Sequence, residues 1–261
     1  MLILRAILRL IRLDSSLLAF LAIFVPLLVR TRDAAQSLGR AIPLLFIFIC
    51  TFIANDLDDV EKDQVNHPDR PLPAGHITPL FAAILYFTSL GLALFSIKYY
   101  ISPGIAFLYY ALIALTISYG YIVDCLPGLK APYVAAVSSI PIMIVAASYP
   151  DEPRLYFVVA AFFFFNIGRE ICMDIKDRAG DAISFMHRVR PTPLAVAAFS
   201  LQTIGLLLLA VQTHRPGDIV ALLAIIILLL LASIYWFRLA SYRGAIILMK
   251  LPFFIGLYFL T

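Results

Sequence analysis

The segment IPLLFIFICTFIANDLDDVEKD, residues 42–63, places a charged cluster directly after a long apolar run. Its last nine residues, Asn55 to Asp63, hold five carboxylates and one amide. The apolar part is typical of a helix inside a bilayer, where carboxylates are costly unless cations or protons neutralise them. The segment therefore predicts a membrane helix that ends in an acidic cluster with a counter-ion.

The whole chain has the composition of a membrane protein. Of its 261 residues, 62% are hydrophobic and 14% are charged, whereas about a quarter are charged in soluble domains. Nine apolar stretches suit helices that cross the bilayer: roughly 15–30, 41–55, 77–97, 104–123, 132–149, 155–169, 192–211, 219–237 and 244–260. We therefore expect one all-α, multi-pass domain over residues 1–261.

Residues 1–14 and the distribution of charge predict how the chain lies in the membrane. Arg5, Arg9 and Arg12 recur among Leu and Ile at spacings of four and three, which indicates an interfacial amphipathic helix. With nine spans, thirteen Lys and Arg residues fall on the face that includes the N-terminus, and six fall on the other. The positive-inside rule places the first face in the cytoplasm. No basic stretch is interleaved with aromatic residues, so we expect no nucleic-acid partner.

The acidic residues gather in two triplets with the same spacing. Asp56, Asp59 and Asp63 stand at i, i+3 and i+7, and the triplet Asp174, Asp177 and Asp181 repeats this pattern 118 residues later. On a helix these offsets fall within an arc of about 60°. Solvated loops also carry aspartates, but two matched triplets on one predicted face favour a clamp that holds Mg²⁺ and a diphosphate, since Mg²⁺ binds through a few carboxylates and phosphate oxygens.

Two motifs carry a resemblance to a known family. The stretch NDLDDVEKDQVNHPDRPLPAG, residues 55–75, resembles the NDxxDxxxD signature of the UbiA superfamily of intramembrane prenyltransferases, with its trailing N-x-P-x-R-P-[IL]-P-x-G. The stretch REICMDIKDRAGD, residues 169–181, resembles the second motif in the form found in the digeranylgeranylglyceryl phosphate synthase branch. The likeness extends over nearly the full chain.

The resemblance implies a nine-helix bundle around a central cavity that is open to lipid, with both motifs on the cytoplasmic side. It assigns Mg²⁺ binding to seven residues: Asn55, Asp56, Asp59, Asp63, Asp174, Asp177 and Asp181. The six aspartates would be catalytic through this metal. Asn55, Arg70 and Lys130 would contact the diphosphate, and Tyr119 and Tyr121 are candidates for lining the cavity.

The resulting functional hypothesis is Mg²⁺-dependent transfer of an isoprenyl group from a prenyl diphosphate to a lipophilic acceptor. A membrane terpene cyclase of the same superfamily, which needs no separate acceptor, is the alternative because it uses the same clamp. The flank AISFMHRVRPTP after Asp181 lacks the basic residue, glycine and T-L-P that are usual in the transferase branch. A carrier or channel with acidic cation sites would explain the charge, but not the tail of the first motif.

Overall fold

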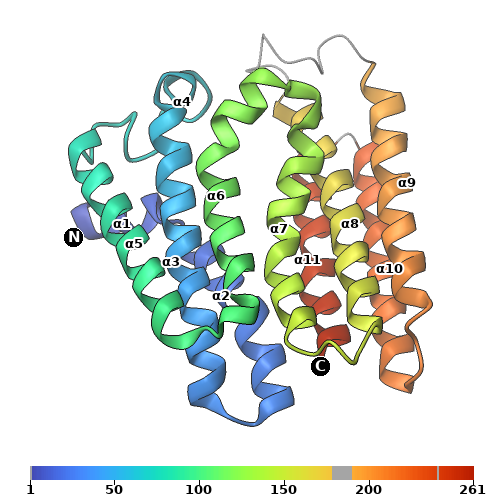
Figure 1. The fold of residues 1–261 in the computed structure, drawn as a ribbon. Helices are drawn as coiled ribbons and strands as arrows, with labels where there is room; N and C mark the ends of the chain where they lie inside the picture. Colours follow the sequence, from blue (N-terminus) through green and yellow to red (C-terminus); the bar gives the residue numbers. More distant parts are fainter. Residues whose placement is uncertain (1, 178–189, 240) are drawn as a thin grey trace. The chain divides into compact units, whose positions relative to one another are not determined.

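A computed structural model describes residues 2–177, 190–239 and 241–261 of the chain (Figure 1). The described residues form eleven α-helices and two short 3-10 helices, with no strand among them. The chain divides into two compact units, Met1–Tyr121 and Ile122–Thr261. The prediction of an all-α chain is therefore confirmed.

The helices of the first unit begin near the N-terminus and include the segment of the first aspartate motif. They are α1 (Leu2–Leu10), α2 (Leu13–Thr31), α3 (Ala34–Asp58), α4 (Val60–Asn66), α5 (Pro79–Tyr100) and α6 (Pro103–Cys125), whose last turn lies beyond the unit boundary. The second unit contains η1 (Pro127–Leu129), α7 (Lys130–Ala147), α8 (Arg154–Asp177), α9 (Pro191–Ala210), α10 (Pro216–Phe237), α11 (Tyr242–Gly256) and η3 (Leu257–Leu260).

The membrane spans agree closely with those expected from the sequence. Within the described ranges, eight helices are long and apolar enough to cross a bilayer: α2, α3 and α5 to α10. The ninth expected span, 244–260, corresponds to α11 followed by η3. The chain is therefore an integral, multi-pass membrane protein with about nine spans.

Helix ends in the first unit follow from local sequence signals. The Asp33 side chain accepts a hydrogen bond from the Gln36 N–H, and Thr78 caps α5 in the same way through the Phe81 N–H. Such caps satisfy backbone donors that the first helical turn leaves free. Arg12 has φ of +43° and ψ of +57°, a left-handed conformation that is uncommon for a residue other than glycine. It separates the short helix α1 from the spanning helix α2.

The core of the first unit fixes the neighbourhood of the acidic cluster. Helix α3 packs against α2 and α5 (Figure 1). One buried apolar cluster joins α1, the end of α3, the chain after α4 and the start of α5: Ala6, Leu10, Ile53, Leu72, Ile77 and Ala82. These contacts hold α1 and the turn after α4 beside the charged end of α3.

In the second unit, α8 packs against α7 on one side and α9 on another. Small residues bring α8 and α9 close together. A Cβ on Gly168 would meet the backbone of Ala198 and lie 2.8 Å from Cγ of Gln202, and a Cβ on Gly205 would lie 2.7 Å from the Ala161 carbonyl oxygen. Close approach at small residues is typical of helix pairs in membranes, and it holds the helix of the second aspartate motif firmly against α9.

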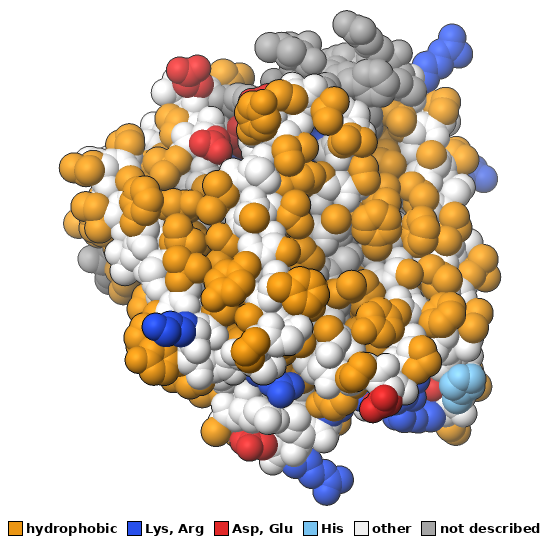
Figure 2. Space-filling view, in the orientation of Figure 1, with side chains coloured by type: hydrophobic (Ala, Val, Ile, Leu, Met, Phe, Trp, Pro, Cys, Tyr) orange, Lys and Arg blue, Asp and Glu red, His pale blue; other side chains and the backbone are white. Residues whose placement is uncertain are grey.

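Side chains on the surface sort as expected for a protein in a bilayer. Figure 2 shows apolar side chains over the sides of the helices in each unit, with Lys, Arg, Asp and Glu mainly near helix ends. Large apolar side chains such as Phe87 and Leu230 are 68% and 59% exposed. Such exposure suits contact with lipid chains rather than with water.

The close contact between α8 and α9 leads to a prediction on stability. Gly168→Ala should lower the free energy of unfolding by about 1–3 kcal/mol, because the added methyl group overlaps the Ala198 backbone. Thermal unfolding in detergent micelles measures this loss. Gly91→Ala in α5 is the matched control, since nothing lies within 4 Å of its Cβ position; equal destabilisation by both substitutions would contradict the packing described here.

Candidate functional site

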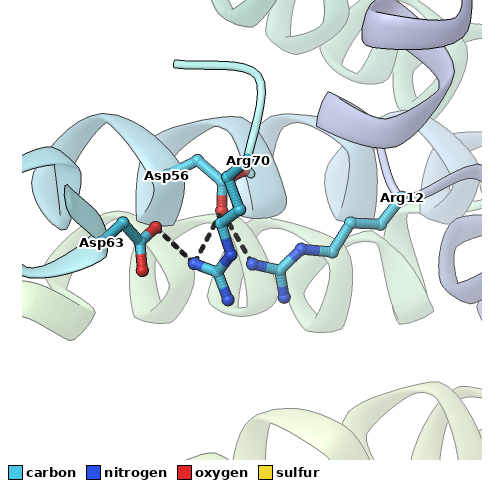
Figure 3. Close-up of polar contacts among 4 residues, drawn as sticks. All are labelled: Arg12, Asp56, Asp63 and Arg70. Atoms are coloured by element: carbon cyan, nitrogen blue, oxygen red, sulfur yellow. Dashed lines mark hydrogen bonds and ion pairs between the residues drawn. The ribbon is translucent and has the colours of Figure 1, made fainter. Parts of the chain in front are cut away.

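The first aspartate motif forms a buried ion-pair cluster centred on Arg70. Its Nη1 atom bonds to Oδ2 of Asp63 and lies 3.5 Å from Oδ1 of Asp56. Figure 3 shows both carboxylates directed at this guanidinium. Asp56 and Asp63 are only 2% and 4% exposed. One arginine thus joins two carboxylates that would otherwise repel each other.

Arg12 gives Asp56 a second positive partner. Its Nη2 atom donates to Oδ1 of Asp56 at 2.7 Å, and its guanidinium carbon lies 5.0 Å from the ring centre of Phe52. The Arg12 and Arg70 side chains are 33% and 29% exposed, far more than the carboxylates that they bind. A buried carboxylate is tolerated only with such compensation. The cluster therefore presents cationic groups at its more accessible side.

The backbone between the carboxylates is not one continuous helix. Helix α3 ends at Asp58, Asp59 lies at the junction with φ of −97° and ψ of +11°, and α4 starts at Val60. The triplet Asp56, Asp59 and Asp63, which was expected on one face of a single helix, is thus interrupted at Asp59. Asp56 and Asp63 still lie close together, because both contact Arg70.

The tail of the motif, residues 67–75, is a series of turns that fixes Arg70 in place. The Arg70 N–H donates to the His67 carbonyl, and the Arg70 carbonyl accepts from the Ala74 N–H, each at 3.0 Å. Gly75 follows with φ of +69°, where glycine avoids the strain that a side chain would add. Leu72 then anchors the segment in the core of the unit.

Other residues expected in this unit occupy varied positions. Asn55 and Asp59 are half-buried at the end of α3, and the Asn55 carbonyl accepts the Asp59 N–H at 3.0 Å. Tyr119 is half-buried on α6, whereas Tyr121 is 77% exposed. Lining of a cavity by the two tyrosines stays a prediction.

The second aspartate motif has its own basic partner. The Lys130 Nζ atom, in the first turn of α7, donates to Oδ1 of Asp174 at 2.5 Å, and Asp174 is 9% exposed. One turn earlier on α8, Glu170 pairs with Arg169 at 2.5 Å. The structure therefore joins Lys130 and Asp174, which the resemblance assigned to the same ligand. The Asp177 side chain and all of Asp181 lie outside the described residues.

The donor atoms in each unit suit magnesium with phosphate. In the part of the chain that the structure describes, no three His, Cys, Asp or Glu side chains are grouped closely enough to hold a metal ion by themselves. Mg²⁺ usually takes one or two carboxylates and completes its shell with water and phosphate oxygens. Asp56 and Asp63 fit that requirement, because the guanidinium groups beside them are of a kind that can also bind phosphate oxygens.

Sequence patterns alone did not single out Arg12 as part of the cluster. It is the last of three arginines with helical spacing among Leu and Ile, and this pattern is equally typical of a helix on the membrane surface. Its partner Asp56 lies 44 residues away. No local signal distinguishes Arg12 from Arg5 and Arg9, so the contact emerges only from the fold.

A comparison with known families decides the relationship. Residues 15–258 match the model of the UbiA prenyltransferase family. The chain belongs to this family. The UbiA motifs found in the sequence are the segments that form the two ion-pair sites described above.

Curated relatives of this UbiA chain include proteins named digeranylgeranylglyceryl phosphate synthase. The protein from Pyrococcus furiosus is 35% identical over 130 residues, which cover 49% of this chain and 46% of the relative. The protein from Saccharolobus solfataricus is 28% identical over 243 residues, covering 88% and 84%. The chain spans about half the length of the relative in several of these matches, including the one from Pyrococcus furiosus.

Solved structures of UbiA homologues have the same fold. The apo structure of a homologue from Aeropyrum pernix K1 has a TM-score of 0.79 at 16% identity, covering 94% of this chain and 96% of that chain. A homologue from Archaeoglobus fulgidus, bound to GPP and Mg²⁺, has a TM-score of 0.63 at 17% identity, covering 98% and 99%. The likeness confirms the predicted fold class.

The ion pair between Arg70 and Asp63 generates a prediction. Arg70→Met should lower the free energy of unfolding by about 3 kcal/mol, because it leaves a buried carboxylate without its guanidinium partner; the partial exposure of Arg70 places the loss at the low end for buried pairs. Thermal unfolding without Mg²⁺ tests this. Adding Asp63→Asn to the Arg70→Met variant should recover part of the loss, and failure of the double variant to do so would contradict the pairing.

Proposed function

We propose that this chain is a Mg²⁺-dependent prenyltransferase that moves an isoprenyl group from its diphosphate to a lipophilic acceptor. The observation that carries the proposal is the pair of buried carboxylates, Asp56 and Asp63, joined through Arg70 within the motif of the UbiA family. The names of the curated relatives and the GPP and Mg²⁺ bound to the Archaeoglobus fulgidus homologue support this assignment.

In this proposal both aspartate motifs hold the metal and, through it, the diphosphate. The metal ligands would be Asn55, Asp56, Asp59, Asp63, Asp174, Asp177 and Asp181. Bound Mg²⁺ would neutralise the negative charge that grows on the diphosphate as the allylic carbon–oxygen bond breaks. The buried position of Asp56, Asp63 and Asp174 keeps these carboxylates in surroundings where electrostatic attraction is strong.

The basic residues complete the diphosphate site. A guanidinium has five N–H donors in a fixed plane, so Arg70 can keep a carboxylate partner and still donate to a phosphate oxygen. Lys130 offers three donors from its ammonium group and would act in the same way beside Asp174. Asn55 would add an amide at the end of α3. Arg70 and Lys130 are held by their carboxylate partners, and donors with fixed positions favour stabilisation of the leaving diphosphate.

The apolar helices would protect the allylic cation that forms when the diphosphate leaves. An allylic cation reacts readily with water, so the reacting carbon must lie where water is excluded. Membrane-spanning helices supply such surroundings, and aromatic faces such as those of Tyr119 and Tyr121 could lower the energy of the cation by about 0.5–2 kcal/mol each. The acceptor would reach the site from the lipid phase.

We further propose that the chain works as one domain with both motifs on the cytoplasmic side. The excess of Lys and Arg on that predicted face supports this orientation. Helix α1 has Ala6 and Leu10 in the core, whereas Ile3 and Leu4 are 68% and 63% exposed. This division suits a helix that lies along the membrane surface.

The assignment of the carboxylates predicts a large loss of activity on substitution. Asp56→Asn and Asp174→Asn should each lower the rate of diphosphate release by at least about 10²-fold, the scale for removing one group that stabilises developing charge. Release from labelled prenyl diphosphate in detergent or liposomes measures this. Glu61→Gln, on the exposed side of α4, is the matched control, and a near-native rate in either aspartate variant would remove that residue from the site.

The choice between transfer and cyclisation predicts a dependence on acceptor. With Mg²⁺ and labelled prenyl diphosphate, we expect diphosphate release and an extractable prenylated product only when an acceptor is added. Geranylgeranylglyceryl phosphate, a phenol and a quinone precursor are the three acceptor classes to compare. Cyclic hydrocarbon or alcohol formed without acceptor would instead identify a cyclase, and cation flux without turnover would contradict both activities.

A further inference from the structure

Asn166 is a buried amide in the membrane-spanning helix α8. It is 8% exposed, and its Nδ2 atom has no hydrogen-bond partner in the described part of the chain. Buried polar groups in proteins are nearly always hydrogen-bonded. An amide donor without a partner inside a membrane helix is costly, because no bulk water is present to replace the missing bond. Among the described residues, the Asn166 donor is therefore available to a bound molecule.

The position of Asn166 on α8 connects it with the second aspartate motif. Asn166, Glu170 and Asp174 follow one another at intervals of four residues, so they lie within an arc of about 80° on the same side of the helix. Gly168 faces α9, and two helical positions separate side chains by about 160°. Asn166 is therefore directed away from the contact between α8 and α9.

The axial position of Asn166 places it on the apolar side of Asp174. Eight residues of helix correspond to about 12 Å. If the diphosphate binds near Asp174, as in the proposed function, the allylic carbon lies next to the diphosphate and the attacking atom of the acceptor lies about 3–3.5 Å beyond that carbon. Asn166 therefore lies deeper in the apolar part of α8 than the proposed diphosphate site, on the side where the isoprenyl chain and the acceptor would bind.

The amide N–H of Asn166 needs a partner that can accept a hydrogen bond, which narrows the choice among the molecules in the reaction. An isoprenyl chain is hydrocarbon and offers no atom that accepts a hydrogen bond, and water near the reacting carbon would divert the cation. The remaining molecule in a transfer reaction is the acceptor, whose oxygen atoms can accept from an amide N–H. We infer that Asn166 is an acceptor-positioning residue that donates to an oxygen of the lipophilic acceptor. This inference rests on the proposed transferase function.

Gln202 provides a matched comparison within the same helix pair. It is fully buried on α9, and its Nε2 and Oε1 atoms have no hydrogen-bond partner among the described residues. Unlike Asn166, it lies in the tight contact with α8, because its Cγ atom is 2.8 Å from the Cβ position of Gly168. No ligand can enter that contact, so Gln202→Met tests the loss of a buried amide without loss of an acceptor contact.

The experiment compares steady-state kinetics of the unsubstituted protein and three variants in Mg²⁺, with geranylgeranyl diphosphate as donor and geranylgeranylglyceryl phosphate as the probe acceptor. Asn166→Leu should raise the KM for the acceptor at least about tenfold and leave the KM for the diphosphate within about twofold. Asn166→Gln, which keeps an amide, should recover part of the acceptor affinity. Gln202→Met should leave both constants unchanged.

A second measurement separates positioning from folding. The probe acceptor should raise the midpoint of thermal unfolding of the native protein, because a ligand stabilises the state that binds it; this rise should be much smaller for Asn166→Leu. Equal changes in both KM values, or an unchanged acceptor KM, would overturn the inference while leaving transferase activity intact. Product formation that needs no acceptor would overturn the proposed transferase function itself.

Discussion

The cost of placing carboxylates at the end of an apolar helix governs this structure. Asp56 and Asp63 are almost completely buried, and their charge is compensated by the guanidinium groups of Arg70 and Arg12. Such groups persist in a membrane protein only where each charge has a partner. The break between α3 and α4, the turns around Arg70 and the packing of α1 all serve to bring these four side chains together (Figure 3).

Each of the two units neutralises buried carboxylates with a basic side chain, but the basic residue differs. In the first unit two carboxylates share one arginine, and in the second Asp174 pairs with Lys130 from the neighbouring helix α7. Lysine is a compact charge with a flexible stem, whereas arginine offers a planar fork that can bind two oxygens at once. In the proposed function, Arg70 would offer a phosphate group a fixed planar contact and Lys130 would offer an adjustable one.

Much of the fold followed from sequence because membrane helices have a strong signal. Uninterrupted apolar runs mark them, and every expected span has a helical counterpart in the structure. The spacing of Asp56 and Asp63 predicted that the two side chains lie on one side of a helix, but it predicted neither that both contact Arg70 nor that the helix breaks at Asp59. The contact of Arg12 and the proposed role of Asn166 could not be predicted from local sequence, since the first depends on a distant residue and the second on a hydrogen bond that is missing among the described residues.

The position of Arg12 near the N-terminus determines the order in which the partners of Asp56 are synthesised. Synthesis runs from the N-terminus, so Arg12 leaves the ribosome 44 residues before Asp56, whereas Arg70 follows Asp56 by 14 residues. Of the two arginines that contact Asp56, Arg12 is therefore the one that is already synthesised when Asp56 is added to the chain. A chain that has been synthesised only as far as the end of α3 thus already contains a cation that can neutralise this carboxylate, before Arg70 is added.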